Sequence, residues 1–248
     1  MDSSATTGKS TSINKPEKKE RAAIAQMFDQ IAWRYDFLNH FFSLHIDKIW
    51  RRRAVNELRG QPIDNVLDVA TGTADLALII QKRLHPEYIT GVDISERMLA
   101  IGRQKIEKKG LSQQISLQYG ASEALPFADQ TFDAVTVAFG VRNFENLEKG
   151  LDEMFRVLKV GGKLVILEFS VPQNRFFRSV FNFYFLRVLP LMGRFISKET
   201  RAYQYLPESV QSFPHGTEFK MIMEMSGFKN MMSRSLTFGI TSIYTGIK

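Results

Sequence analysis

The sequence predicts an α/β fold: a mostly parallel seven-stranded sheet with helices on both faces. Short apolar runs alternate with helical patterns from Ile63 onward, which is typical of right-handed βαβ crossovers. The last two apolar runs are separated only by Thr237-Phe238-Gly239, which is too short for a helix. They therefore predict a hairpin with one antiparallel strand. A chain of 248 residues is long enough for one domain of this kind.

The residues before this alternation divide into a tail and a helical region. Residues 1–20 are rich in Ser, Thr and Lys, so they cannot bury enough apolar surface to offset the entropy lost on ordering. We therefore expect a disordered tail over 1–20 and N-terminal helices over 21–60. The apolar spacing predicts helical segments at Arg21–Asn39, Phe37–Ile49 and Trp50–Leu58.

The alternating part predicts the strands and helices around the sheet. The expected strands are Asn65–Val69, Tyr88–Asp93, Ile115–Tyr119, Phe132–Ala138, Lys163–Glu168, Phe228–Leu236 and Ile240–Gly246. The expected helices are Ala74–Leu84, Ser95–Lys109, Asn146–Leu158 and Thr217–Met225. Ser95 is suited to cap the second of these helices. Gly110 and the pair Gly161-Gly162 are placed to close two of them, because glycine is favoured just after a helix C-terminus.

The first strand leads into a turn that is typical of nucleotide-binding folds. Asn65–Leu76 reads N-V-L-D-V-A-T-G-T-A-D-L, with Asp68 at the end of the strand and Gly72 in the turn. Asp93 ends the second strand about twenty residues later, where a carboxylate can accept the two hydroxyls of a ribose. The dinucleotide fingerprint G-x-G-x-x-G is missing, which argues against NAD. A cationic methionine group needs fewer glycines and tolerates a nearby carboxylate, so the turn favours S-adenosylmethionine. The alternative is an ordinary βα turn in which Asp93 only caps the next helix.

Composition narrows the classes of partner and compartment. The net charge of +7 suits an anionic partner, although many cytoplasmic enzymes are simply basic. The chain has no cysteine, which excludes disulfides and fits a reducing cytoplasm. Its four histidines are scattered, so we expect no metal site. The first twenty residues lack the apolar core of a signal peptide.

A Phe-rich insertion at about 172–212 interrupts the alternation before the last helix. Between Arg175 and Arg201 it holds six basic residues and one acid, Glu199. Arginines, Pro190 and Gly193 break it up, so it is not a transmembrane span. A basic amphipathic helix here predicts a membrane-surface element or a lid over an apolar ligand, and the alternative is a helix packed on the core. One face of that helix would carry Phe177, Phe181, Tyr184 and Val188.

Several motifs together resemble those of the quinone C-methyltransferases of menaquinone and ubiquinone biosynthesis. In chain order they are M-F-D-Q-I-A-W-R-Y-D-F-L-N, V-L-D-V-A-T-G-T-A-D, G-V-D-I-S-E-R-M-L, E-A-L-P-F-A-D-Q-T-F-D, F-G-V-R-N, E-M-F-R-V-L-K-V-G-G-K-L-V-I-L-E-F-S and Y-Q-Y-L-P-E-S-V. The resemblance runs from about Met27 to the C-terminus. It implies a class I methyltransferase (Rossmann-like) fold, with 21–248 as a single methyltransferase domain.

The resemblance also implies the reaction. A methyl group would pass from S-adenosylmethionine to a ring carbon of demethylmenaquinol, giving menaquinol. The alternative is C-methylation of 2-methoxy-6-polyprenyl-1,4-benzoquinol in ubiquinone biosynthesis. No metal is implied. The expected partners are a prenylated quinol and the membrane surface, with no nucleic acid and a possible homodimer. The expected place is the cytoplasm, with peripheral association at the inner face of the cell membrane.

Cofactor-binding residues follow from the turn and from the resemblance. The expected set is Asp68, Gly72, Thr73, Asp93, Ile94, Ala121, Ser122 and Ala138. By the resemblance, Thr73 and Asp93 fall on cofactor positions, and the pair Ala121-Ser122 lies beside the adenine. The chain departs from the family at Ala74, where Gly is usual, and at Ala121, where Asp or Asn is usual. A methyl group at Ala74 is tolerated if the backbone there is helical.

The candidates for catalysis lie just after the fourth strand and within the insertion. The resemblance implies that Arg142 and Asn143 face the quinol. Arg142 stays protonated, so it would stabilise a phenolate or hold a water molecule rather than act as the base itself. Tyr205 is the third candidate, and Tyr35, Asp36 and Tyr203 are further candidates for orienting the ring. For each tyrosine the alternative is packing in the core.

Three other functions remain open at the level of the sequence. The basic pI suggests a nucleic-acid methyltransferase, but A-F-G-V-R-N replaces the N/D-P-P-Y motif that holds a flipped base. The departures at Ala74 and Ala121 leave room for a non-catalytic lipid-binding protein. An NAD oxidoreductase lacks its glycine fingerprint.

Overall fold

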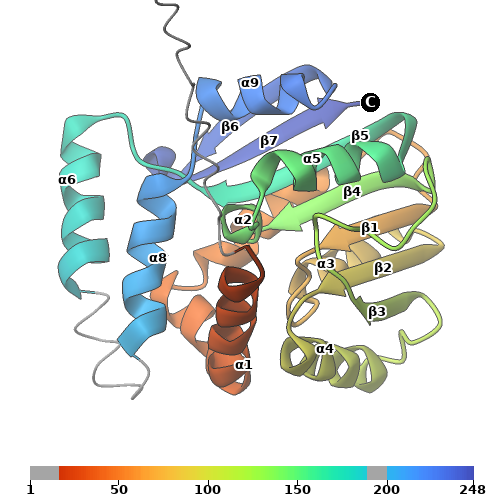
Figure 1. Ribbon diagram of the computed structural model, residues 1–248, viewed down its shortest axis with the longest axis horizontal. Helices are drawn as coiled ribbons and strands as arrows, with labels where there is room; N and C mark the ends of the chain where they lie inside the picture. Colours follow the sequence, from red (N-terminus) through yellow and green to blue (C-terminus); the bar gives the residue numbers. More distant parts are fainter. Residues whose placement is uncertain (1–16, 189–199) are drawn as a thin grey trace, which may run out of the picture.

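A seven-stranded sheet in the order β3-β2-β1-β4-β5-β7-β6 forms the centre of the computed structural model, which describes residues 17–188 and 200–248. The first five strands pair in parallel, and β7 runs antiparallel to both β5 and β6. Figure 1 shows the parallel strands ending at the edge where α6 and α8 stand. The strands are β1 (Asn65–Val69), β2 (Tyr88–Asp93), β3 (Ile115–Tyr119), β4 (Phe132–Ala138), β5 (Leu158–Phe169), β6 (Lys229–Leu236) and β7 (Thr241–Ile247).

Helices cover both faces of this sheet, as expected. The helices α5 (Leu147–Val157) and α9 (Thr217–Met225) pack on one face. The helices α2 (Ile46–Asn56) and α3 (Asp75–Leu84) pack on the other. At the β3 edge lies α4 (Glu96–Lys108), which contacts β2 and β3.

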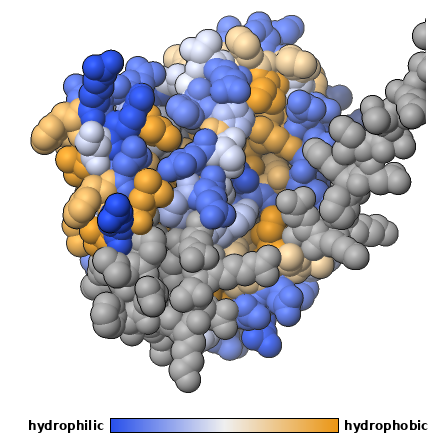
Figure 2. All heavy atoms as spheres, turned by 60° about the vertical axis from the view of Figure 1, so that its left-hand side comes forward, coloured by the Kyte–Doolittle hydropathy of each residue, from blue (hydrophilic) through white to orange (hydrophobic). Residues whose placement is uncertain are grey.

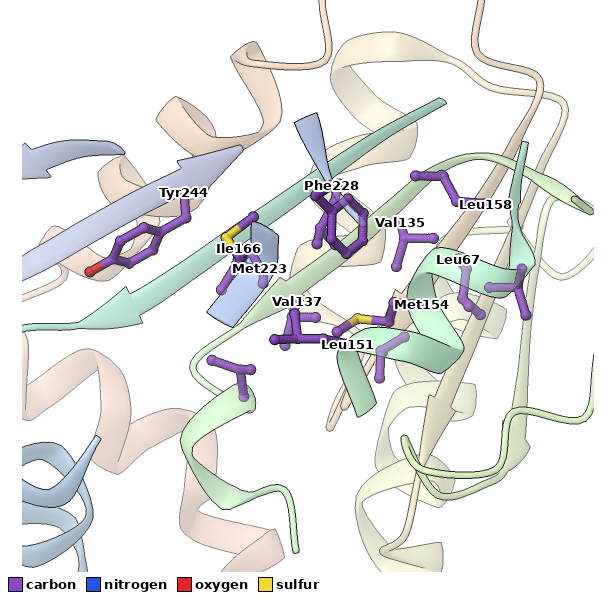
Figure 3. Close-up of a cluster of buried hydrophobic side chains, with 14 of the residues drawn as sticks. Leu67, Val135, Val137, Leu151, Met154, Leu158, Ile166, Met223, Phe228 and Tyr244 are labelled. Carbon is purple, nitrogen blue, oxygen red and sulfur yellow. The ribbon is translucent and has the colours of Figure 1, made fainter. Parts of the chain in front are cut away.

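The central strands are mostly apolar because both faces of the sheet are buried there, whereas the edge strand β6 is largely exposed. Along β1, Leu67 and Val69 join the core beneath α5 and α9, whereas Val66 joins the core beneath α2 and α3. Figure 3 shows the first of these cores, in which Leu151 and Met154 of α5 point toward the side chains of the strands. This core fixes where the strands end, and therefore where a site at their carboxyl edge can form.

The fifth strand begins earlier than the sequence predicts. Leu158 is already extended after the last turn of α5, and Gly161-Gly162 lies inside β5 instead of closing that helix. Gly161 adopts a φ of +79°, and its N–H donates to Lys248 O at 3.0 Å. The glycines therefore serve a bulge that lets β5 keep pairing near the chain end. By contrast, Gly110 lies just after α4 with φ +67°, as predicted.

The N-terminal helices also differ from the prediction. A single helix, α1 (Glu17–Phe42), begins inside the expected tail and continues beyond Asn39. The chain then turns at Leu44 and His45, which both adopt a left-handed backbone. This turn contains no Gly or Pro, so the sequence carries no turn signal there. Trp50 therefore lies inside α2 instead of starting a helix, and its Nε1–H donates to Thr237 Oγ1 at 2.8 Å. The rest of the expected tail, residues 1–16, lies outside the described residues.

The described parts of the insertion are α6 (Arg175–Phe183), the π-helical turn η2 (Tyr184–Val188) and α8 (Thr200–Ser212). The predicted apolar face of α6 packs on the protein: Phe181 is buried with Val210 of α8, and Phe177 stacks on Phe238 at a centroid distance of 4.2 Å. For Phe177 and Phe181 the structure therefore agrees with the alternative of a helix packed on the core. A second face, with Phe176, Val180 and Phe183, is exposed.

None of the helices in the described ranges 17–188 and 200–248 is long and apolar enough to cross a membrane.

Candidate active site

The turn after β1 places three residues in the left-handed backbone region. Gly72 has φ +56°, and it is flanked by Ala70 at +52° and Ala74 at +65°. Gly72 adopts this conformation without strain, whereas each alanine costs about 1 kcal/mol. The expectation of a helical backbone at Ala74 is therefore wrong: Ala74 precedes α3 as its N-cap, and its side chain is fully buried.

The carboxylate of Asp93 holds this turn from the end of β2. Its Oδ2 accepts from the N–H of Gly72 at 2.8 Å, and its Oδ1 accepts from the N–H of Ser95 at 2.9 Å. Burial raises the pKa of Asp93 to about 6. Ser95 in turn caps α4 by accepting from the N–H of Met98, as predicted. Asp93 thus serves the loop and the helix cap, and it also faces a cleft.

That cleft opens at the carboxyl edge of the sheet. Its walls include five residues of the predicted cofactor set and one predicted catalytic residue, namely Gly72, Asp93, Ile94, Ser122, Ala138 and Asn143. The structure therefore brings together the ends of β2 and β4 and the loops after β1, β2, β3 and β4. It also adds Ile24 and Phe28 of α1, for which the only signal in the sequence was the helical spacing of an apolar face.

The cleft is acidic as well as apolar. Asp93, Glu123 and Glu145 line it, and no Lys, Arg or His side chain is found among the described residues of its wall. Glu123 was missed from the sequence although it is the first residue of E-A-L-P-F. Its Oε1 accepts from the N–H groups of Glu145 at 2.8 Å and Asn146 at 3.3 Å, which ties the two sides of the cleft together. A cleft of this charge suits a cationic ligand.

Three predicted cofactor residues do not line the cleft. Asp68 is buried beneath the turn, where it accepts from the hydroxyls of Thr71 at 2.6 Å and Thr136 at 2.8 Å. Burial raises the pKa of Asp68 to about 6. The hydroxyl of Thr73 donates to Asp36 of α1, and Ala121 forms an isolated bridge with Ala124. Their contacts with a cofactor stay predictions.

Arg142 is buried in an ion pair beside the cleft. Its Nη1 lies 2.7 Å from Glu168 Oε1 and donates to Phe139 O at 2.6 Å. The guanidinium also lies over the ring of Phe169. Glu168 is fully buried and was missed, although a lone acid ending the apolar run L-V-I-L-E was a signal. Arg142 is not part of the cleft wall, and its role in the reaction stays a prediction.

The other two catalytic candidates meet at the cleft. The hydroxyl of Tyr205 on α8 donates to Asn143 Oδ1 at 3.0 Å, although 62 positions separate them in the chain. Asp36 is bound to Thr73 and Lys105 instead of facing the cleft. The side chains of Tyr35 and Tyr203 lie outside the described part of the structure, so their roles stay predictions.

In the described ranges, no three His, Cys, Asp or Glu side chains are grouped so that they could hold a metal ion.

Comparison with known proteins identifies the group to which this chain belongs. The model of the ubiE/COQ5 methyltransferase family matches residues 15–248. A relative from Bacteroides fragilis named demethylmenaquinone methyltransferase is 47% identical over 230 residues, covering 93% of this chain and 94% of its own length. A relative from Geobacter sulfurreducens named ubiquinone/menaquinone biosynthesis C-methyltransferase UbiE is 50% identical over 233 residues, covering 94% of this chain and 90% of its own length.

Solved structures agree on the fold. A SAM-dependent methyltransferase from Thermotoga maritima, described as a possible histamine N-methyltransferase, has a TM-score of 0.62 at 18% identity and covers 90% of this chain and 99% of its own. At that identity the likeness shows the class I methyltransferase fold alone. Taken with the family match over residues 15–248, it shows that this chain belongs to the ubiE/COQ5 methyltransferase family, whose methyl donor is S-adenosylmethionine.

Proposed function

We propose that this protein transfers the methyl group of S-adenosylmethionine to a ring carbon of demethylmenaquinol, giving menaquinol. The observation that carries the proposal is the 47% identity, over nearly the whole of both chains, to a relative named demethylmenaquinone methyltransferase. The second candidate substrate is 2-methoxy-6-polyprenyl-1,4-benzoquinol, because the Geobacter relative is named for both ubiquinone and menaquinone biosynthesis.

The described cleft fits this methyl donor. Its walls combine apolar and acidic side chains, and we assign Asp93 to accepting the ribose hydroxyls, which would satisfy the rest of its lone pairs. The sulfonium and ammonium groups would lie beside acidic side chains, in a cleft whose described wall residues include no Lys, Arg or His. Ile94 and Met98 give the cleft an apolar wall against which the adenine ring can pack.

The chemistry requires a nucleophilic ring carbon, an electrophilic methyl group and a proton acceptor. S-adenosylmethionine supplies the electrophile when bound. The ring carbon is more nucleophilic when a quinol hydroxyl is ionised, so a donor that binds that oxygen lowers the barrier. Asn143 lines the cleft, and its hydrogen bond from Tyr205 fixes the orientation of its amide. We assign Asn143 and Tyr205 to holding the quinol ring.

We further propose that the enzyme works in the cytoplasm on the inner face of the cell membrane. The exposed face of α6 presents Phe176, Val180 and Phe183 beside Arg175. Figure 2 shows apolar and strongly hydrophilic side chains side by side on this part of the molecule. A surface of this kind suits an anionic bilayer, in which a prenylated quinol would lie. The adjoining helix α8 carries Tyr205, so the same insertion would join the bilayer to the site.

The substrate is tested by incubating purified protein with methyl-labelled S-adenosylmethionine and demethylmenaquinol. We expect label in the quinol fraction. A parallel reaction with 2-methoxy-6-polyprenyl-1,4-benzoquinol distinguishes the second candidate. If neither quinol is labelled while calorimetry still shows cofactor binding, the proposed reaction is wrong.

The pKa of Asp93 predicts how cofactor binding depends on pH. The ionised carboxylate accepts the ribose hydroxyls, so we expect affinity for S-adenosylmethionine to fall about tenfold from pH 7 to pH 5, as Asp93 is protonated around pH 6. The effect of pH on folding has the opposite sign. Because folding raises the pKa of Asp93 from 3.8 to about 6, this group stabilises the ligand-free fold below pH 3.8. That contribution is lost as the pH rises through about 6. Titration calorimetry at each pH measures the first effect.

Two variants control this measurement. Asp93→Asn should bind weakly at every pH, with no step near pH 6. Asp93→Ala should lose about a hundredfold or more in affinity, because it removes charge-assisted hydrogen bonds. A pH step that persists in Asp93→Asn would assign the titration to Asp68, whose pKa is also about 6.

The Arg142–Glu168 pair predicts a large stability effect. Arg142→Ala leaves the buried Glu168 carboxylate unpaired, so we expect a loss of about 3–5 kcal/mol in the free energy of unfolding. The double variant Arg142→Met/Glu168→Gln should recover most of it, as measured by urea denaturation. If the double variant regains stability and cofactor binding but not turnover, Arg142 takes part in the reaction. Full turnover would leave it a structural role only.

The membrane proposal predicts that α6 controls binding to vesicles. Phe176→Ser/Phe183→Ser should lower the fraction that floats with vesicles containing anionic phospholipid several-fold, because it removes the exposed apolar face. The matched control is Met221→Ser/Met225→Ser, which removes two exposed apolar side chains from α9. Equal losses for both variants, or none for either, would contradict a specific role of α6.

A further inference from the structure

The first helix forms one wall of the cofactor cleft. Ile24 and Phe28 of α1 line the same space as Gly72 and Asp93. Figure 1 shows α1 lying across the carboxyl edge of the sheet, next to α8, which it contacts. A bound S-adenosylmethionine would therefore touch α1, and the position of this helix bears on how firmly the ligand is held.

Apolar contacts hold part of α1 in place. Of the α1 side chains that the structure describes, Met27 and Ala32 are buried, and Trp33 is 70% exposed. Most helices of globular proteins depend on a buried apolar face for their stability. In the described part of α1, polar contacts add to this packing.

The ammonium group of Lys105, on α4, is the centre of those contacts. Its Nζ lies 2.5 Å from Asp36 Oδ2 of α1, 2.7 Å from Asp75 Oδ1 of α3 and 3.0 Å from Thr73 Oγ1 of the cofactor turn. The hydroxyl of Thr73 closes the ring by donating to Asp36 Oδ1 at 2.5 Å. An ammonium group has three N–H donors, and each has an acceptor here.

A second contact fastens the same helix near Asp93. The hydroxyl of Ser95 donates to Asp29 Oδ1 of α1 at 2.5 Å, and the backbone N–H of Arg97 donates to the same oxygen at 3.3 Å. The two contacts lie on either side of the turn that carries Gly72. Together they join α1 to the cofactor turn and to the start of α4.

We propose that Lys105 is a positioning residue for S-adenosylmethionine: through Asp36 and Thr73 it keeps α1 closed over the cleft and so slows release of the ligand. Lys105 is not part of the cleft wall, so it acts through α1 and the turn and does not touch the ligand itself. The side chains of Lys105 and Asp36 are about a quarter exposed, so the pair can open without stranding a charge in the core. The proposal rests on the cofactor site assigned above.

The test compares Lys105→Met with the wild-type chain. We expect the dissociation rate and the Kd of S-adenosylmethionine to rise about tenfold, the size expected for losing two partly buried ion pairs. Amide hydrogen exchange in α1 should become faster. Turnover at saturating S-adenosylmethionine should not fall, because the reacting atoms are not in contact with Lys105. Lys105→Arg, which keeps the charge, should recover most of the slow release.

The matched control is Lys159→Met, which breaks a lysine–aspartate pair of 2.6 Å with Asp133 at the opposite edge of the sheet. It should lower the melting temperature without changing ligand release. If Lys105→Met does not fold, Asp36→Asn tests the same contact and should speed release in the same way. Release within twofold of wild type in these variants, with unchanged exchange in α1, would overturn the proposal. Failure of the wild-type chain to bind S-adenosylmethionine would instead refute the assigned cofactor site.

Discussion

The site depends first on the carboxylate of Asp93. Parallel pairing of β1 with β2, with Val69 opposite Val92, brings the ends of both strands to the same edge. Asp93 then accepts from backbone N–H groups of Gly72 and Ser95, which belong to the loops after those two strands. This one side chain thus sets the conformation of the cofactor turn and the start of α4. Partial burial raises its pKa to about 6.

Around this contact, the polar residues of the carboxyl edge satisfy one another. The carboxylate of Asp68 accepts hydrogen bonds from two hydroxyls, and Arg142 forms an ion pair with Glu168. This is what burial requires, because a charge or polar group taken out of water is destabilising unless it is paired. Some of the polar groups that face the cleft are themselves held in place, as Asn143 is by the hydroxyl of Tyr205. Preorganisation of this kind is what a methyl-transfer site needs, since the reacting atoms must be brought into line.

The insertion has one face that packs on the protein and one that is exposed. Its inner face packs through Phe181 on α8, and its outer face leaves Phe176 and Phe183 in solvent. The two faces are interleaved along one helix of period 3.6, so a Phe-rich sequence alone does not tell them apart. The position of β5, β7 and α8 decides which side is covered.

The amino-acid sequence was enough to predict the class of fold, the bounds of β1 to β4, the cap at Ser95 and the family, because these follow from local periodicity, capping chemistry and ordered motifs. It also placed Gly72, Asp93 and Ser122 at a common site, because parallel strands bring their carboxyl ends to one edge.

The partners of the charged residues follow from the packed fold. The pairing of Lys105 with Asp36, of Arg142 with Glu168 and of Asn143 with Tyr205 joins positions far apart in the chain, so no local pattern encodes it. The start of α1 and the left-handed turn at Leu44 and His45 are likewise set by what packs against them. Which polar groups face the ligand and which are already paired is therefore a property of the packed molecule, because the strength of each contact depends on burial and distance.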